Sequence, residues 1–169
     1  WQGTWQITDG GTDFLCASIT GKILPYQLEK RIHLKDNCLH VQYRLCNTSE
    51  WQMRCILAAH PLLWIRDGCH ITLPWEHVRI VNTLHMQNRL GIPGNVHTWP
   101  YAGQHDLRQI GTADGTAEKF YCLSPKVQQE ELNCILTHPD GKKVVLSYPA
   151  QDWPELGVWI NNGGYAGQR

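Results

Sequence analysis

A single histidine interrupts one of the most apolar stretches of this sequence. The run ILAAHPLLWI covers residues 56–65, and His60 stands in it directly before Pro61. Burying an imidazole without a hydrogen-bond partner costs free energy, whereas an imidazole at the rim of an apolar surface can transfer a proton near neutral pH. From the residues alone, a core histidine is the favoured interpretation and a proton-transfer group is the alternative. The apolar run predicts a buried strand around His60.

Other kinds of chemistry have weaker support in the sequence. His70 and His77 are seven residues apart in strand-like sequence, which places them on opposite faces of a sheet. The sequence has no HExxH motif, no CxxC pair and no GxSxG motif, so neither a zinc enzyme nor a serine hydrolase is expected. The run NNGGYAG at 161–167 lacks the ending of a phosphate loop and predicts a tight turn with a positive φ. We expect no metal and no cofactor.

The charge balance excludes some classes of partner. Fifteen basic residues match fifteen acidic ones, so no strong net field would draw the chain to nucleic acid or to an anionic membrane. No apolar stretch reaches the roughly 18–20 residues of a membrane-spanning helix, and no signal peptide is recognisable. The seven cysteines, without a paired motif, are typical of small buried side chains in a reducing compartment. A cytoplasmic setting is the default expectation, and the oligomeric state is left open.

Alternation of apolar and polar residues predicts an all-β fold. It runs through residues 31–35 and 39–45, and the turn residues Asp36 and Asn37 between them predict a β-hairpin. A second hairpin is predicted where Asp140 and Gly141 separate two apolar runs. Its strands are 132–137 and 144–148, and further strands are predicted at residues 4–8, 14–19, 53–57, 62–65, 77–81, 119–123 and 158–160. Many short strands without a helical stripe indicate an antiparallel β-sandwich, which we expect to form a single domain over residues 1–169.

The segment 82–118 differs from the rest of the chain. It is polar and glycine-rich, and it is too long for an ordinary connection, so it is predicted to be a functional loop or to contain short strands. The sequence also has eight tryptophans, which in a sandwich are more often core residues than platforms for a sugar ring. The tryptophans that could reach one face are Trp64, Trp99, Trp153 and Trp159.

Four stretches of the sequence, in the same order, resemble the aldose 1-epimerase (galactose mutarotase) family. PYQLEKRIHL followed by CLHVQYRLCNTSE is similar to paired strands that end in a structural turn at Asn47. AAHPLLWIRDGCHITLP at 58–74 is similar to the family's His-Pro strand, and HTWP at 97–100 to a Trp-Pro element of its middle loop. WPELGVWINNGGYAG is similar to a strand and glycine-rich turn near the family's end. The resemblance covers most of the chain.

The resemblance implies a galactose mutarotase-like supersandwich that interconverts the α and β anomers of an aldose without a cofactor. In the family a carboxylate takes the proton of the C1 hydroxyl while an imidazole protonates the ring oxygen, and each such group contributes about 10²–10⁴ in rate. By position, His60 matches the general acid. Asp106 lies where the family places a sugar-binding acidic residue, and Trp99 and Trp159 are expected to face the ring. The implied partner is a monosaccharide or another aldose.

The chain departs from the family at both ends. It stops at Arg169, shortly after the glycine-rich turn and before the position of the family's base, a glutamate, and Glu155 is not expected to replace that base. WQGTWQI at the beginning resembles the stretch that follows the family's Asp-His-Gly segment. We therefore expect an internal piece of a mutarotase-like protein, incomplete at both termini.

Two alternatives stay open. A non-catalytic carbohydrate-binding β-sandwich would keep aromatic platforms and lack a base. A mutarotase-like enzyme for phosphorylated sugars would need basic side chains that converge on the site. The candidates for such a cluster are Arg66, Arg79, Arg89 and Arg108.

Overall fold

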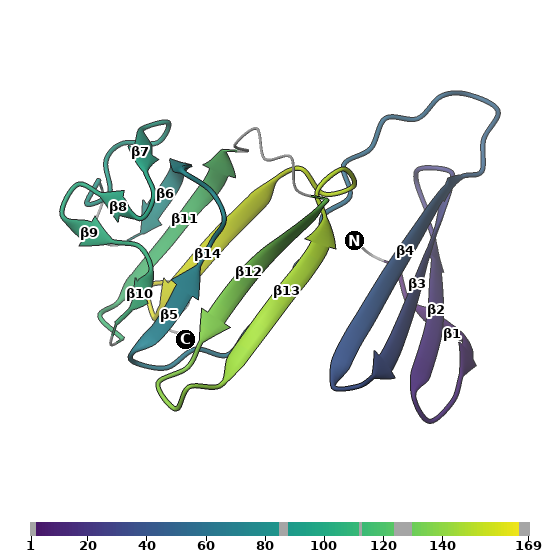
Figure 1. Cartoon of the computed structure of the whole chain (residues 1–169). Coiled ribbons are helices and arrows are strands. Elements are labelled where there is room, and N and C mark those ends of the chain that lie inside the picture. The colour runs from purple at the N-terminus through teal and green to yellow at the C-terminus, as the bar shows by residue number, and fades with distance from the viewer. Residues whose placement is uncertain (1–2, 85–87, 112, 124–129, 166–169) are drawn as a thin grey trace. The chain divides into compact units, whose positions relative to one another are not determined.

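The computed structural model describes residues 3–84, 88–111, 113–123 and 130–165 (Figure 1). Its named elements are all β-strands that pair antiparallel, which confirms the predicted all-β class. In this part of the chain no helix is long and apolar enough to cross a membrane. The chain separates into two compact units, residues 1–60 and 61–169. The single domain expected over residues 1–169 stays a prediction.

The first unit is a four-stranded sheet in the order β1-β2-β3-β4. Its strands are β1 (Gln6–Gly10), β2 (Phe14–Thr20), β3 (Tyr26–Lys35) and β4 (Cys38–Asn47). β3 and β4 form the predicted hairpin, and Asp36 and Asn37 between them have φ values of 50° and 61°. Asp and Asn tolerate this left-handed region better than most residues, and it suits the twist of a two-residue hairpin turn. The resulting register pairs Ile32 with Val41, so apolar residues share one face.

The second unit contains two four-stranded sheets and a small two-stranded one. Its strands are β5 (Cys69–Thr72), β6 (His77–Leu84), β7 (Val96–Thr98), β8 (Tyr101–Ala102), β9 (His105–Asp106), β10 (Gln109–Ile110), β11 (Thr116–Leu123), β12 (Glu131–Thr137), β13 (Lys143–Pro149) and β14 (Leu156–Asn162). The two larger sheets have the orders β10-β5-β12-β13 and β14-β11-β6-β7, and β8 pairs with β9.

The two larger sheets enclose one hydrophobic core, as in a β-sandwich. Ile80 and Phe120 contribute to it from one sheet, and Leu132 and Leu136 from the other. β12 and β13 form the second predicted hairpin, with Gly141 at a φ of 82° in its turn. The sandwich predicted from the alternation is therefore present in this unit, with β6, β11 and β14 containing the strands expected at 77–81, 119–123 and 158–160.

The predicted strands at 53–57 and 62–65 are wrong. No strand lies between β4 and β5, and Ile56 and Leu62 are 94% and 85% exposed. His60 is also exposed, so it does not belong to a buried strand. The apolar run failed as a signal because a strand needs a neighbouring strand for its hydrogen bonds, and hydrophobicity alone does not supply one. Two smaller differences are that β1 begins at Gln6 rather than at residue 4 and that β5 was not predicted.

Two side-chain expectations have mixed outcomes. Asn47 forms a structural turn, because its Oδ1 accepts from the Ser49 amide at 3.0 Å and its Nδ2 donates to the Trp51 carbonyl at 2.6 Å. All seven cysteines are free, but burial holds for only some of them, and Cys55 is exposed rather than part of the core. The buried cysteines are Cys69, Cys122 and Cys134.

The core of the second unit yields a first prediction. Phe120 is fully buried, and its replacement by alanine removes a ring that contacts both Trp99 and the surrounding core. We expect Phe120→Ala to lower the free energy of unfolding by about 3–5 kcal/mol, measured by urea denaturation. Tyr121→Ala is the control, because Tyr121 is exposed on the opposite face, and it should cost about 1 kcal/mol. Equal losses in the two variants would contradict this assignment of the core face.

Candidate functional site

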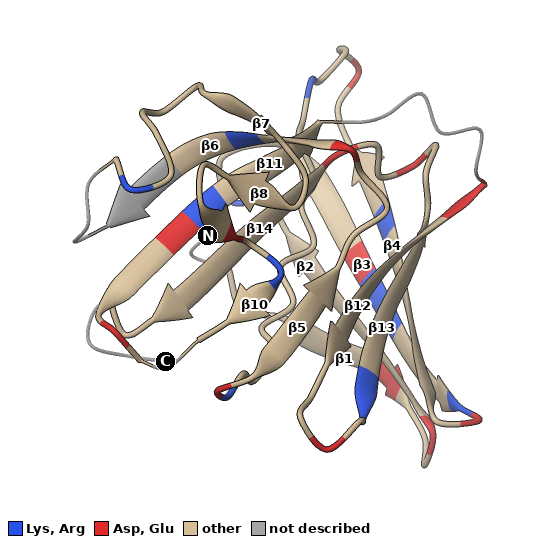
Figure 2. Ribbon diagram, turned by 60° about the vertical axis from the view of Figure 1, so that its left-hand side comes forward, with Lys and Arg blue, Asp and Glu red and all other residues tan. Residues whose placement is uncertain are grey.

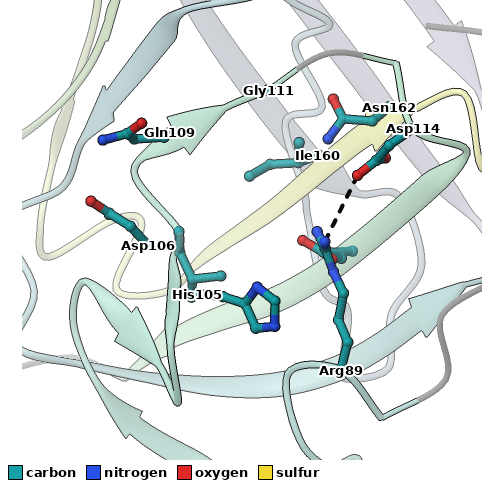
Figure 3. Close-up of a pocket in the computed structure, with 10 residues that line it drawn as sticks. Arg89, His105, Asp106, Gln109, Gly111, Asp114, Ile160 and Asn162 are labelled. Atoms are coloured by element: carbon teal, nitrogen blue, oxygen red, sulfur yellow. Dashed lines mark hydrogen bonds and ion pairs between the residues drawn. The ribbon is translucent and has the colours of Figure 1, made fainter.

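A polar pocket of about 200 Å³ borders the core of the second unit (Figure 3). It is smaller than the roughly 300–1,000 Å³ of pockets for drug-sized molecules, so its size suits a small polar ligand. Most of its lining comes from the segment 82–118, where the sequence predicted a functional loop or hidden short strands. The polar residues that line it include Arg89, His105, Asp106, Asp114, Glu118 and Asn162.

The pairing of β11 with β14 places one wall of the pocket. Glu118 lies opposite Ile160, and Thr116 lies opposite Asn162. Because side chains alternate along a strand, Glu118 shares the face of Phe120, which is the core face. The apolar core therefore continues along these two strands into a polar end.

Polar burial is concentrated at this end of the two strands. Thr116, Glu118 and Asn162 are 1%, 5% and 6% exposed, and they are the buried polar residues found among those that the structure describes. Burial of polar groups costs free energy unless each is paired, so natural proteins seldom gather them without a functional reason. A concave site with converging polar groups is the default location for ligand binding.

Arg89 reaches the buried carboxylate from a segment that is anchored at the next residue, Leu90. Leu90 next to it is buried in the core, and its carbonyl accepts a hydrogen bond from Nε2 of His97 at 2.7 Å. The Arg89 guanidinium donates from Nε to Oε1 of Glu118. Its Nη1 lies 3.8 Å from Oδ2 of Asp114. One arginine thus balances part of the charge of two carboxylates.

Asp114 is held as an anion by a local turn. Burial raises the pKa of this carboxyl, but hydrogen bonds from the hydroxyl and the amide of Thr116 and the charge of Arg89 outweigh burial and lower it. The Thr116 amide donates to Oδ1 at 3.0 Å. Asp114 therefore presents a carboxylate to the pocket at neutral pH.

Asp106 lines the pocket beside His105, in the part that β9 contributes. Arg108 donates to its Oδ1 from Nε at 2.9 Å and to its Oδ2 from Nη2 at 2.7 Å, and Nη2 also lies 3.3 Å from the hydroxyl of Tyr101. This side-chain hydrogen bonding from Arg108 lowers the pKa of Asp106 despite a contribution from burial that raises it. His105 before it is exposed, so the pocket has an imidazole that solvent can reach.

Asn162 is the least satisfied member of the site. Its side-chain oxygen Oδ1 is buried and has no hydrogen-bond partner. In Figure 3 its amide points from β14 into the pocket. A buried acceptor without a donor costs about 1–3 kcal/mol, which a bound donor would recover.

Of the four residues that the resemblance assigns to the sugar site, the structure brings one, Asp106, into the pocket, and Arg89, a candidate only for binding a phosphate, lines it as well. Trp99 is partly buried and packs against Phe120 with 6.0 Å between ring centroids. Trp159 lies on the face of β14 opposite to Ile160, where it is 41% exposed and meets Tyr165 edge-on at 4.9 Å. His60 is not among the residues that line the pocket. The roles expected for these residues in sugar binding and proton transfer stay predictions.

Most of the pocket residues give no signal in the sequence, but two of them, which were not predicted, do. Glu118 precedes Phe120 by two positions, and Asn162 follows Ile160 by two, so each is a polar residue in phase with a buried face. The predicted strand 119–123 began one residue too late to include Glu118. For His105 and Arg89 no comparable pattern exists, because they lie in or near short elements without periodicity.

Of the four arginines considered for a phosphorylated sugar, Arg89 lines the pocket, where it pairs with Glu118, and two of the others pair with carboxylates elsewhere or beside it. Arg66 pairs with Asp140 at 3.0 Å, Arg108 pairs with Asp106, and Arg79 lies on β6. Figure 2 shows acidic and basic positions interspersed along the strands. Within the described ranges, no group of three His, Cys, Asp or Glu side chains is arranged to hold a metal ion.

Comparisons with known proteins add no further identification. Neither family models, nor curated protein sequences, nor solved structures give a match to this chain.

The buried ion pair yields a second prediction. Loss of one partner leaves the other charge buried, which costs about 3–5 kcal/mol in a closed site, and Arg89 is still partly exposed. We expect Arg89→Ala to lower the free energy of unfolding by about 3 kcal/mol. The double variant Arg89→Met/Glu118→Leu removes both charges and should recover most of that loss. The single variants Arg89→Met and Glu118→Leu complete the double-mutant cycle, and additive effects in it would show that the pair does not couple the two segments.

Asp106 yields a third prediction, on pH. Its folded-state pKa lies below the ordinary value of about 3.9, so ionised Asp106 stabilises the fold above that pH, and the contribution is lost as the pH falls through the folded pKa. We expect Asp106→Asn to be less stable than the parent at pH 7, with a difference that shrinks below about pH 4. Urea denaturation of both proteins across this range measures it. A difference that stays constant down to about pH 2.5 would contradict the argument.

Proposed function

We propose that this chain is an aldose 1-epimerase-like isomerase that interconverts the α and β anomers of an aldose. The observation that carries the proposal is the polar pocket, in which Asp106 lies together with an exposed imidazole and two buried polar residues, Glu118 and Asn162. Sugar hydroxyls are both donors and acceptors, and such a mixture of carboxylate, amide, guanidinium and imidazole groups is able to pair with them. The type of reaction is inferred from the resemblance of the sequence to the aldose 1-epimerase family.

The proposed reaction is acid–base ring opening. A carboxylate accepts the proton of the C1 hydroxyl, the C1–O1 double bond forms and the bond between C1 and the ring oxygen breaks, while an imidazolium gives its proton to that oxygen. Rotation about C1–C2 and the reverse steps give the other anomer, so no net proton or electron is exchanged. The substrate's own oxygens supply the chemistry, and the reaction draws on no cofactor.

The resemblance alone assigns the role of proton donor to His60, which belongs to the first unit, whereas the pocket lies in the second. His105 is a second imidazole, and it is the one that lines the pocket. Asp106 would hold a sugar hydroxyl, because its two hydrogen bonds from Arg108 keep it a carboxylate and fix its orientation. A carboxylate with a lowered pKa is a good hydrogen-bond acceptor and a weak base, so a binding role suits Asp106 better than proton removal.

A second candidate function is carbohydrate binding without catalysis. It is favoured by exposed aromatic rings on the outer face of the sheet β14-β11-β6-β7, where Trp159 and Tyr165 meet at 4.9 Å and Tyr121 lies on the same side as Trp159. Aromatic rings with one open face present apolar surface to the carbon–hydrogen face of a sugar. A protein of this kind would bind sugars without changing their rate of anomerisation.

The fourth prediction tests the isomerase. Fresh α-glucose and α-galactose are followed by polarimetry with the full chain, and we expect mutarotation above the spontaneous rate. His60→Ala should lower the catalysed rate by about 10²–10⁴ because it removes the acid. Asp106→Asn should mainly raise the concentration needed for half-maximal rate.

His105→Ala is the matched comparison. If the catalysed rate falls in His105→Ala but not in His60→Ala, the proton donor is His105 rather than His60. Sugar binding in calorimetry with no acceleration in any protein would reject the isomerase and leave the binding function. Circular dichroism of each variant checks that the fold is retained.

A further inference from the structure

The charge of the pocket points to the kind of ligand it receives. Three carboxylates line it, from Asp106, Asp114 and Glu118, and Arg89 is the arginine among the lining residues. Arg108 neutralises Asp106 from beside the pocket. With the His105 imidazole neutral, three negative charges against the two positive charges of these arginines leave one negative charge, close to a wall from which solvent is largely excluded.

The hydrogen-bonding groups of the pocket also favour a cationic ligand. An ionised carboxylate is an acceptor only, and Oδ1 of Asn162, which has no hydrogen-bond partner among the residues that the structure describes, is an acceptor as well. Asn162 is 6% exposed, so water from bulk solvent has little access to it. A ligand that fits this wall must bring hydrogen-bond donors, and a ligand that also balances its charge must bring a cation.

We propose that the pocket binds a ligand with a primary ammonium group, which donates to Oδ1 of Asn162 and balances the carboxylate of Asp114. The proposed function gives the rest of the ligand, so this inference rests on it: the preferred sugar is an amino sugar. A neutral sugar hydroxyl can also donate to Asn162, but it leaves the negative charge unbalanced. Hydrogen bonds between charged partners are about twice as strong as neutral ones, which makes charge the source of discrimination.

The decisive measurement compares three sugars of similar shape by calorimetry with the full chain. Glucosamine is the cationic test ligand, because its primary amine is largely protonated at about pH 6.5. Glucose and N-acetylglucosamine are the neutral controls. We expect glucosamine to bind at least about tenfold more tightly than either control, and the preference to shrink as salt rises from about 0.05 M to about 0.5 M. Ethanolamine tests the ammonium without the sugar ring and should bind more weakly than glucosamine.

Variants locate the ammonium. Asn162→Leu removes the unpaired acceptor, so it should weaken glucosamine binding about tenfold or more and at the same time raise the melting temperature of the ligand-free chain. Asp114→Asn should reduce the preference for glucosamine over glucose. Asp13→Asn, an exposed carboxylate of the first unit, should leave binding unchanged. A purely structural role for Asn162 would change the melting temperature without changing the preference for the cation.

The outcomes separate this inference from the proposed function. Equal affinity for glucose and glucosamine, or unchanged binding in Asn162→Leu, overturns the ammonium site even where polarimetry shows catalysis. A clear preference for glucosamine without acceleration of anomerisation supports the ammonium site and rejects the isomerase. No binding of any of these ligands overturns both.

Discussion

The arrangement of the pocket in the second unit depends on how one buried carboxylate is paired. Glu118 lies on the core face of β11 at 5% exposure, where an unpaired charge would cost several kcal/mol. Its partner, Arg89, comes from an irregular segment that is fixed by burial of Leu90 and by the hydrogen bond from His97. The sandwich therefore requires this segment in place as much as the segment requires the sandwich. This ion pair thus ties the irregular segment to the core strand β11 and fixes one wall of the pocket.

Strand register connects the core to the pocket. Along β11 the same face carries Phe120 and Glu118, and along β14 it carries Ile160 and Asn162. A shift of one residue would turn all four side chains to the other face, so the apolar contacts that hold the register also aim the polar groups. The site is consequently as well defined as the core beside it, although most of its other residues come from short strands and turns.

The parts of the fold that the sequence predicts are those with local causes. The hairpin turns at Asp36 and Asn37 and at Gly141 need a positive φ, and flanking alternation sets the strands. The apolar run around His60 misled because a strand depends on a neighbour that the run itself does not reveal. The pocket could be predicted only in part. Glu118 is detectable in the sequence because it is a polar residue in phase with the buried face of its strand. Arg89 is not, because only the tertiary structure brings it to Glu118.

The pairing of the arginines also decides which sugars suit the pocket. A phosphate would have to compete with a carboxylate for Arg89, and success would leave Glu118 buried without its partner. Arg108 is likewise engaged by Asp106, and Arg66 by Asp140. The binding free energy that an anionic ligand gains from one of these arginines is thus offset by the loss of the arginine's ion pair. A ligand that donates hydrogen bonds can pair with the unpaired oxygen of Asn162 without breaking an ion pair. The balance of these terms favours an unphosphorylated sugar over a phosphorylated one.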